Sequence, residues 1–425
     1  MEYLPQMESL RAGIRVLGLV LLAAGGAGCS VPRPDLPEPG ESLAAYYRRA
    51  AGVERLPVSS PRFYDSGPAI RAEMLDLVDS AQDHILLDSF LLNDGPASRE
   101  ILDALAEKAA RGVTVRVIGD ASSRFVMEPE AFEYLESRGV AAAEFNPVKG
   151  WRLLTPPILL ERDHRKFWVV DGRRVLLGGA NLSDLSLIPP GQGGNRDLMV
   201  GFDSPAAARL LTRSFVETWS DSEASLEIRE ADFRPAADSP ANGPEYWFFN
   251  EEKVRKRPCM TAVMLEGLYA SARKSVWLVE PYTFTSPGIL AGIRSMTARG
   301  VEVNLVLSSQ VRAPRFRYAS YYGIKDLLSA GARVWIFDSE TSPLHYKCAL
   351  VDDRLAYVGS ANLNYRSLRL SRELNVVFDD PVGVAEIRKV VESVRKGCRE
   401  VDEKEARAYR TLPFATWWAI MQTAG

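Results

Sequence analysis

One string of spaced residues occurs twice in the sequence, and this duplication limits the possible folds more than any other feature. The first copy, "DHRKFWVVDGRRVLLGGANLSD", places a lysine 2, an aspartate 7 and an asparagine 17 residues after its histidine. The second copy, "LHYKCALVDDRLAYVGSANLNYRSL", repeats all three offsets. The two sets are His164, Lys166, Asp171 and Asn181, and His345, Lys347, Asp352 and Asn362. Because the chain has only 3 histidines, two in equivalent places indicate a duplicated unit with duplicated chemistry.

The segments before the two strings also match. "ILDALAEKAARGVTVRVIGD" and "ILAGIRSMTARGVEVNLVLSS" each predict a helix that ends at a glycine, Gly112 or Gly300, followed by a strand of alternating valines. A helix and then a strand precede this pair in both halves, and a further helix and strand follow it. The predicted fold class is therefore α/β, with two similar halves. Each half is a mixed sheet flanked by helices, and the halves pack with one shared active site.

Each string itself predicts a hairpin. Apolar runs flank Asp171-Gly172 in the first copy and Asp352-Asp353 in the second, as expected for two strands joined by a tight turn. Antiparallel pairing brings the histidine and lysine at the start of one strand next to the asparagine after its neighbour. We interpret Asp171 and Asp352, which complete the catalytic motif, as acceptors for backbone or basic groups, because they lie at the turns.

The residue types in each patch suit phosphoryl transfer. A neutral imidazole is a competent nucleophile or base, a lysine two residues later lies on the same side of the strand, and Lys166, Lys347, Asn181 and Asn362 can bind phosphate oxygens. With two patches, one histidine can attack phosphorus while the other protonates the leaving oxygen. Candidates for carboxylates that orient the histidines are Asp197 and Glu373, each assigned to the histidine of its own half.

Composition limits the partners. The formal net charge is −3 and the pI is about 5.9, whereas non-specific nucleic-acid binders carry a basic excess. We therefore expect no nucleic-acid partner, although the basic and aromatic segment at 310–318 keeps a nuclease-type phosphodiesterase open as the alternative. With 3 histidines and 4 scattered cysteines, no metal site and no cofactor are expected.

The N-terminus predicts export. Arg11 and Arg15 precede an apolar stretch that ends in "GAGC", which indicates a lipoprotein-type signal peptide over 1–28 and lipidation of Cys29. Gly26 departs from the usual leucine of such a site, and an uncleaved anchor or ordinary signal is the alternative. The expected location is the bacterial cell envelope, on the periplasmic side, with the membrane surface contacted through the N-terminal lipid.

The predicted domain limits follow from these patterns. A lipidated cysteine and proline-rich tether occupy 29–59, the two halves occupy 60–235 and 236–400, and a helical tail occupies 401–425. The tryptophan-rich tail is predicted to dock on the protein's own core, with contact to a bilayer as the alternative. The apolar segment 151–160 is either core or a lip that contacts acyl chains.

At these residues the sequence resembles the phospholipase D superfamily, and within it the bacterial cardiolipin synthases, over roughly residues 60 to 400. The resemblance implies a two-domain α/β fold with one shared active site, metal-independent chemistry and a phosphatidyl-histidine intermediate. It further implies that His164 is the nucleophile and His345 the acid and then the base. Departures from the family pattern are the signal-like segment in place of transmembrane helices, and Gly179, Arg372 and Leu374.

The predicted function is that of a phosphodiesterase or phosphatidyltransferase acting on phospholipids. If phosphatidylglycerol is the acceptor the product is cardiolipin, and if water is the acceptor the enzyme is a phospholipase D. A scaffold without activity is a third hypothesis, against which the two complete residue sets count. The acceptor, the head group and the oligomeric state stay open.

Overall fold

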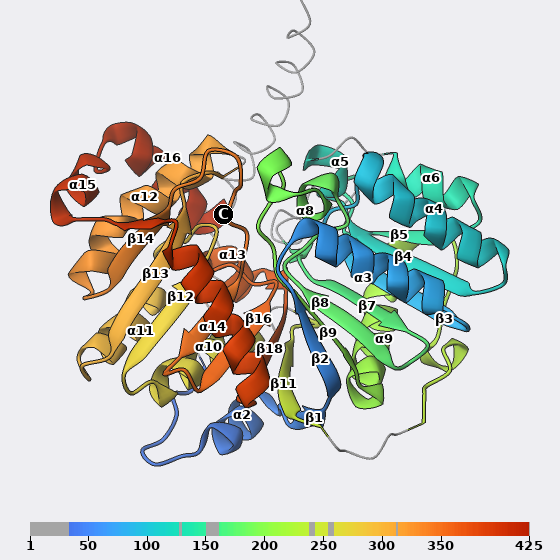
Figure 1. Cartoon of the computed structure of the whole chain (residues 1–425), viewed down its shortest axis with the longest axis horizontal. Helices are drawn as coiled ribbons and strands as arrows, with labels where there is room; N and C mark the ends of the chain where they lie inside the picture. The colour runs from blue at the N-terminus through green and yellow to red at the C-terminus, as the bar shows by residue number, and fades with distance from the viewer. Residues whose placement is uncertain are drawn as a thin grey trace, which may run out of the picture.

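The computed structural model describes residues 34–126, 130–149, 161–237, 243–253, 259–311 and 313–424. The predicted signal peptide, Cys29 and the segment 151–160 lie outside these residues. Two halves lie side by side, each built on one large mixed sheet with helices on its outer side (Figure 1). The predicted α/β fold with two similar halves is confirmed.

The sheet of the first half has eight strands in the order β10-β5-β4-β3-β7-β8-β9-β2. Strands β3, β4 and β5 are parallel, and the remaining pairs are antiparallel. The strands are β2 (Ser59–Tyr64), β3 (His84–Ser89), β4 (Thr114–Asp120), β5 (Ala141–Phe145), β7 (Lys166–Val170), β8 (Arg174–Gly178), β9 (Met199–Asp203) and β10 (Ser222–Ala224).

The sheet of the second half repeats this order as β19-β14-β13-β12-β15-β16-β18-β11 and adds β1 at its edge. The strands are β1 (Arg55–Pro57), β11 (Glu245–Asn250), β12 (Ser275–Val279), β13 (Glu302–Ser308), β14 (Arg333–Phe337), β15 (Cys348–Val351), β16 (Leu355–Gly359), β18 (Leu374–Phe378) and β19 (Cys398–Glu400). Because β1 joins this sheet and β2 joins the other, residues 55–64 connect the two halves at the edges of both sheets.

Helices cover the outer face of each sheet, where alternate strand residues are apolar. In the first half these are α3 (Gly67–Ser80), α4 (Pro96–Ala110) and α6 (Ala131–Ser137), and in the second α10 (Met260–Ser271), α11 (Pro287–Thr297) and α12 (Pro314–Ser329). The inner faces share one hydrophobic core with α9 (Pro205–Ser220) and α14 (Pro381–Arg395). This common core fixes the two halves against each other, and so fixes any site between them.

The predicted tether is wrong for its second part. Residues Leu43–Ala51 form helix α2, which Ser42 caps by accepting a hydrogen bond from Ala45 N. Tyr47 is fully buried among the helices of the second half, and its hydroxyl donates to the Met264 carbonyl oxygen at 3.0 Å. The prolines before this helix indicated an extended segment, and two adjacent tyrosines were too weak a pattern to predict a helix. Burial of these tyrosines stabilises the packing of α2 on the second half.

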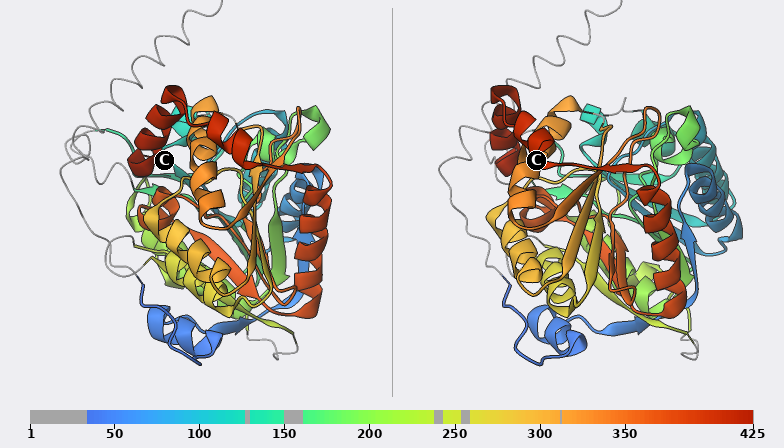
Figure 2. Two further views of the ribbon diagram at one scale, coloured as in Figure 1. Left: turned by 90° about the vertical axis from the view of Figure 1, so that its left-hand side faces the viewer. Right: turned by 60° about the vertical axis from the view of Figure 1, so that its left-hand side comes forward.

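The C-terminal segment forms α15 (Glu403–Ala408) and α16 (Leu412–Ala424), and α16 lies along α12 (Figure 2). Trp418 stacks at a tilt on Tyr322 with ring centroids 5.3 Å apart, and its indole N–H donates to Thr285 Oγ1 at 3.2 Å. The prediction that the tail docks on the protein's own core is confirmed. In the part of the chain that the structure describes, no helix is long and apolar enough to span a bilayer.

Candidate active site

Both predicted hairpins form, and they place the repeated residues as the spacing requires. In the first, Val170 pairs with Arg174 across a turn in which Asp171 and Gly172 have φ of 51° and 61°. In the second, β15 and β16 pair in the same register across Asp352 and Asp353, with φ of 54° and 53°. Two successive positive φ values give the tight turn whose twist matches that of the strands.

The two motif aspartates lie away from the histidines. Asp171 accepts three backbone hydrogen bonds, from residues 82, 83 and 84, at 2.8, 2.8 and 3.0 Å. Asp352 does the same for residues 273, 274 and 275, at 2.8, 2.7 and 2.9 Å. At about 3.3 Å per strand residue, each lies roughly 20 Å from its histidine. Both aspartates therefore lie too far from the histidines to belong to the catalytic set. Their role as acceptors of backbone hydrogen bonds agrees with the interpretation from the turns.

The carboxylates that orient the histidines come from the opposite halves. His164 Nδ1 lies 3.1 Å from Glu373 Oε2, and His345 Nδ1 lies 2.8 Å from Asp197 Oδ2. Our assignment of each carboxylate to the histidine of its own half was therefore wrong. Because Nδ1 donates to a carboxylate, each neutral ring carries its lone pair on Nε2, and in His345 this atom faces Lys347 Nζ at 3.2 Å.

Backbone hydrogen bonds hold this exchange in place. The His164 amide donates to the Arg372 carbonyl at 3.0 Å, and the His345 amide donates to the Arg196 carbonyl at 2.8 Å. Around the first contact, β6 (Arg162–Asp163) and β17 (Ser371–Arg372) form a short parallel pair between the halves. The two crossings are equivalent, so the histidines occupy matching positions on either side of one interface.

A serine hydroxyl donates a hydrogen bond to each carboxylate, but the two serines lie at different positions in their halves. Ser360 Oγ donates to Glu373 Oε2 at 2.5 Å, whereas Ser186 Oγ donates to Asp197 Oδ2 at 3.2 Å. Gly179 occupies the position equivalent to Ser360, and a Cβ there would lie 2.5 Å from Asp197 Oδ1. The glycine that departs from the family pattern thus makes room for the carboxylate that serves His345.

Each lysine contacts the histidine of its own half. Lys347 Nζ lies 3.2 Å from His345 Nε2 and donates to the His345 carbonyl at 2.7 Å, while Lys166 Nζ donates to the His164 carbonyl. Asn181 Oδ1 accepts from Leu91 N at 3.2 Å, which leaves its amide hydrogens for other acceptors. Side chains of both lysines are at least nine-tenths buried, so their ammonium groups are poised for an anion from the interface.

Burial and neighbouring charge shift the proton affinities in the site. Burial lowers the pKa of His164 to about 4, reinforced by the ammonium groups of Lys166 and Lys347 and opposed by Glu373. Burial also lowers the pKa of His345, where Asp197 opposes and Lys347 reinforces the shift. Both imidazoles are therefore neutral near pH 7.

The pKa values of the two lysines and of the two carboxylates all lie below their ordinary values. Burial lowers the pKa of Lys166 to about 7, with Glu373 opposing, and lowers that of Lys347. Burial tends to raise the pKa of Asp197 and Glu373, but the adjacent His345 and His164 outweigh it and both values fall below normal. Two carboxylates that stay ionised beneath two neutral rings keep both imidazoles fixed in orientation.

Several residues beside the rings carried no sequence signal. Phe90 meets His164 edge-on with centroids 4.6 Å apart, and Lys166 Nζ lies 4.9 Å from the centre of the same ring. The Tyr282 hydroxyl lies 3.4 Å from Asn362 Nδ2. Both aromatic residues follow the strand that pairs with the motif strand of their half, β3 or β12, so only the alignment of the two halves could have identified them.

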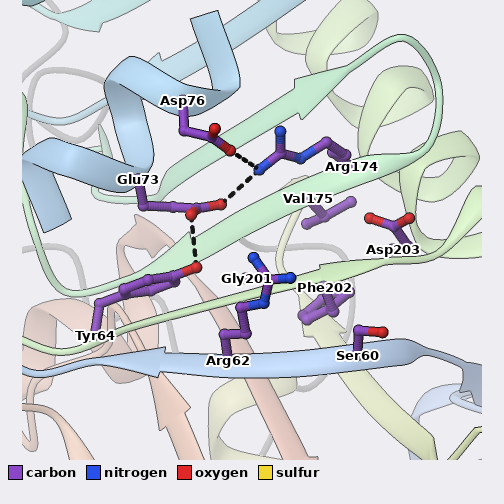
Figure 3. A pocket seen from close by; sticks show the side chains of 10 residues that line it. All are labelled: Ser60, Arg62, Tyr64, Glu73, Asp76, Arg174, Val175, Gly201, Phe202 and Asp203. Carbon is purple, nitrogen blue, oxygen red and sulfur yellow. Dashed lines mark hydrogen bonds and ion pairs between the residues drawn. The ribbon is translucent and has the colours of Figure 1, made fainter. Parts of the chain in front are cut away.

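A separate cleft of about 330 Å³ lies on the first half, away from the histidines (Figure 3). Inside it, Glu73 accepts from the Tyr64 hydroxyl at 2.6 Å and pairs with Arg174, which also pairs with Asp76. None of the predicted site residues lines this cleft. Within the described ranges, no cluster of three or more histidine, cysteine or acidic side chains could hold a metal ion, and metal independence stays a prediction.

The duplicated fold, with a histidine and a lysine from each half at one interface, defines a phospholipase D-like protein. Residues 74–219 and 266–395 match the family described as cardiolipin synthase, PLD-like domain. The chain belongs to this family, and the resemblance inferred from the motifs is confirmed.

Relatives support the same assignment. The chain is 30% identical over 342 residues to cardiolipin synthase 2 of Bacillus anthracis, covering 78% of this chain and 63% of that protein. It is also 30% identical over 338 residues to cardiolipin synthase A of Pseudomonas syringae pv. syringae, covering 79% and 68%. The chain thus spans less than two thirds of the Bacillus relative.

Solved structures share the fold. The phosphatidylserine synthase of Haemophilus influenzae Rd KW20 superposes with a TM-score of 0.68 at 13% identity, covering 90% of this chain and 99% of that one. The polyphosphate kinase of Porphyromonas gingivalis superposes with a TM-score of 0.55 at 14% identity, covering 91% and 55%. At these identities the likeness shows the two-half architecture.

Proposed function

We propose that this protein transfers phosphatidyl groups between phospholipids, as a cardiolipin synthase or a phospholipase D. The observation that carries the proposal is the pair of exchanged hydrogen bonds, His164 to Glu373 and His345 to Asp197. Each orients an imidazole from the opposite half, so both rings are held at one interface. Family membership and the cardiolipin synthase names of the relatives support a phospholipid as the substrate.

The reaction we propose has two displacements. In the first, the free Nε2 of His164 attacks phosphorus, a nitrogen–phosphorus bond forms, and the bond from phosphorus to the head-group oxygen breaks. Protonated His345 gives its Nε2 proton to that oxygen, so a neutral alcohol leaves. The incoming phosphate brings a negative charge that raises the proton affinity of His345, whose ordinary preference here is to be neutral.

In the second displacement an acceptor hydroxyl attacks the phosphatidyl-histidine. His345, now neutral, takes the hydroxyl proton, and the nitrogen–phosphorus bond breaks to release His164. We assign Lys166, Lys347, Asn181 and Asn362 to the phosphate oxygens, where fixed donors stabilise the developing charge. Phosphatidylglycerol as acceptor gives cardiolipin, and water gives phosphatidic acid.

The deciding experiment supplies purified protein with labelled phosphatidylglycerol, with and without added glycerol, and resolves the lipid products. Cardiolipin identifies a synthase, phosphatidic acid identifies a phospholipase D, and glycerol exchange without either identifies a head-group transferase. A parallel reaction with labelled single-stranded DNA tests the alternative substrate. Cleavage of DNA with no lipid turnover would contradict the proposal.

We further propose that the protein is anchored in the cell envelope through a lipid on Cys29. The arginine-led apolar stretch and the small residues before Cys29 support this location. Growth of the producing bacterium with labelled palmitate should label the wild-type chain and leave the Cys29→Ala variant unlabelled. Equal labelling of both chains would contradict the anchor at this cysteine.

A further inference from the structure

Helix α16 presents an exposed face without charge. None of its 13 residues is acidic or basic, and Leu412 at its start is 80% exposed. Thr416 and Ala419, about one and two turns further along the helix, are also exposed. Surface helices of soluble proteins carry charged residues on the face away from the core, so this face is unusual for a surface in contact with water alone.

The face continues into the candidate active site. Tyr282, whose hydroxyl lies 3.4 Å from Asn362 Nδ2, stacks on Phe284 with centroids 5.2 Å apart and meets Phe316 at 5.1 Å. Phe316 and Trp417 belong to the same hydrophobic cluster, between the two helices. Tyr282, Phe316 and Trp417 are each partly exposed, so aromatic surface extends from the asparagine assigned to phosphate as far as α16.

Basic residues border this surface at the start of α12. The guanidinium of Arg315 lies 5.2 Å from the ring centre of Phe316, and that of Arg317 lies 5.7 Å from Tyr318. Arg315 is exposed. Aromatic rings mixed with arginines are typical of protein surfaces that sit at the boundary between lipid head groups and acyl chains.

We propose that the α12–α16 face, formed by Leu412, Thr416, Trp417, Ala419, Phe316 and Arg315, lies on the leaflet that carries the phospholipid substrate. The proposal rests on the proposed function. The apolar surface starts at the phosphate-binding patch and is bordered by cations, which suits an anionic phospholipid bilayer. In this arrangement the phosphodiester rises to Asn362 while its acyl chains stay against the aromatic residues.

Two exposed positions allow a test that spares the core. The Leu412→Glu/Ala419→Glu variant places two negative charges on the face, and Val382→Glu places one at a 63% exposed position on α14, a helix that lies apart from α16 (Figure 1). Full-length proteins are assayed on vesicles of phosphatidylglycerol and phosphatidylcholine, and on a short-chain phosphatidylglycerol below its micelle concentration. Quenching of tryptophan emission by bromine on the acyl chains is measured on the same vesicles.

We expect the double variant to lose about tenfold or more of its kcat/KM on vesicles, and most of its quenching, while its turnover of the monomeric substrate stays within about twofold. Val382→Glu should match the wild type in all three measurements. Arg315→Gln should reduce the preference for vesicles rich in phosphatidylglycerol over phosphatidylcholine alone. Arg315→Gln keeps the test decisive if the double variant also loses monomeric turnover through misfolding.

Unchanged vesicle turnover and quenching in the double variant would overturn the proposal, as would an equal loss in Val382→Glu. If light scattering finds a wild-type dimer that the double variant dissociates, the face is instead an interface between two copies of the chain. Failure of the proposed function has a different signature, because the wild type would then turn over neither vesicles nor the monomeric lipid.

Discussion

His164 and Glu373, separated by 209 residues in the sequence, are joined by a 3.1 Å hydrogen bond between the two halves. Each half supplies a histidine that the other half orients, so neither half contains a complete set. Replacing Glu373 with Gln should lower kcat by about 10²-fold or more, because the ring loses its orienting anion. It should also lower the pKa of His164 further, since the carboxylate now opposes that shift.

Histidine NMR can test this pairing directly, because the chain has only 3 histidines. Glu373→Gln should change the pH titration of the His164 ring resonances. Asp197→Asn should change the pH titration of the His345 ring resonances. His84, which lies in strand β3, serves as the internal control. If the Glu373 substitution changed the resonances of His345 instead, Glu373 would pair with the histidine of its own half.

The pH dependence of kcat/KM should carry the signature of a buried lysine. Since the pKa of Lys166 lies at about 7, raising the pH through 7 removes a cation that binds phosphate, and kcat/KM should fall on the alkaline side. Loss of activity on the acid side, from protonation of His164, should occur near pH 4 rather than near 6.5. Lys166→Arg should move the alkaline fall upward, because arginine stays charged; an unmoved alkaline limb in that variant would exclude Lys166 as its source.

Replacing either histidine with alanine should abolish turnover. His164→Ala removes the proposed nucleophile and His345→Ala the proposed acid, so each should retain less than about 1% of wild-type activity. Wild-type protein should keep its activity after dialysis against a chelator. Full activity in one alanine variant would reject the two-histidine mechanism, and loss of activity in chelator would reject metal independence.

The motif aspartates should matter for stability more than for chemistry. Asp352→Asn keeps a residue that tolerates positive φ but weakens three backbone hydrogen bonds, so we expect about 2 kcal/mol lower unfolding free energy. Asp353→Asn is the matched control, since Asp353 has the same φ but forms one exposed ion pair with Arg388. Denaturant unfolding measures both, and kcat of folded Asp352→Asn should stay within about threefold of the wild type. A loss comparable to that of His345→Ala would assign Asp352 to the chemistry.

Replacing the buried arginine next to His164 should lower the unfolding free energy strongly. Arg165 is fully buried and binds Asp163 at 2.6 Å and Asp88 at 3.2 Å. Arg165→Met leaves a buried carboxylate without its partner and should cost about 3–5 kcal/mol in unfolding free energy. The exposed Arg111→Met, which loses only a surface pair at 3.4 Å, should cost less than about 1 kcal/mol. Equal costs would show that the buried network contributes nothing specific.

The sequence predicted the halves, the hairpins and the residues at the strand ends, because the repeat and the alternation of apolar residues are local patterns. It could not predict which carboxylate meets which histidine, since that depends on how the halves pack. The same limit applies to Phe90 and Tyr282, single aromatic residues after a strand. Helix α2 was missed for a different reason: two buried tyrosines give too short an apolar pattern to outweigh the prolines before them.

The exchange of carboxylates also has a consequence for how such a chain is made and how it diverges. During synthesis the first half emerges without Glu373, so His164, the proposed nucleophile, lacks its orienting carboxylate until the C-terminal half has folded. For the same reason, a substitution that moves Glu373 or Asp197 disturbs the histidine of the opposite half. Divergence of the two copies is therefore limited at these four residues, because each histidine must keep its contact with the carboxylate of the other half.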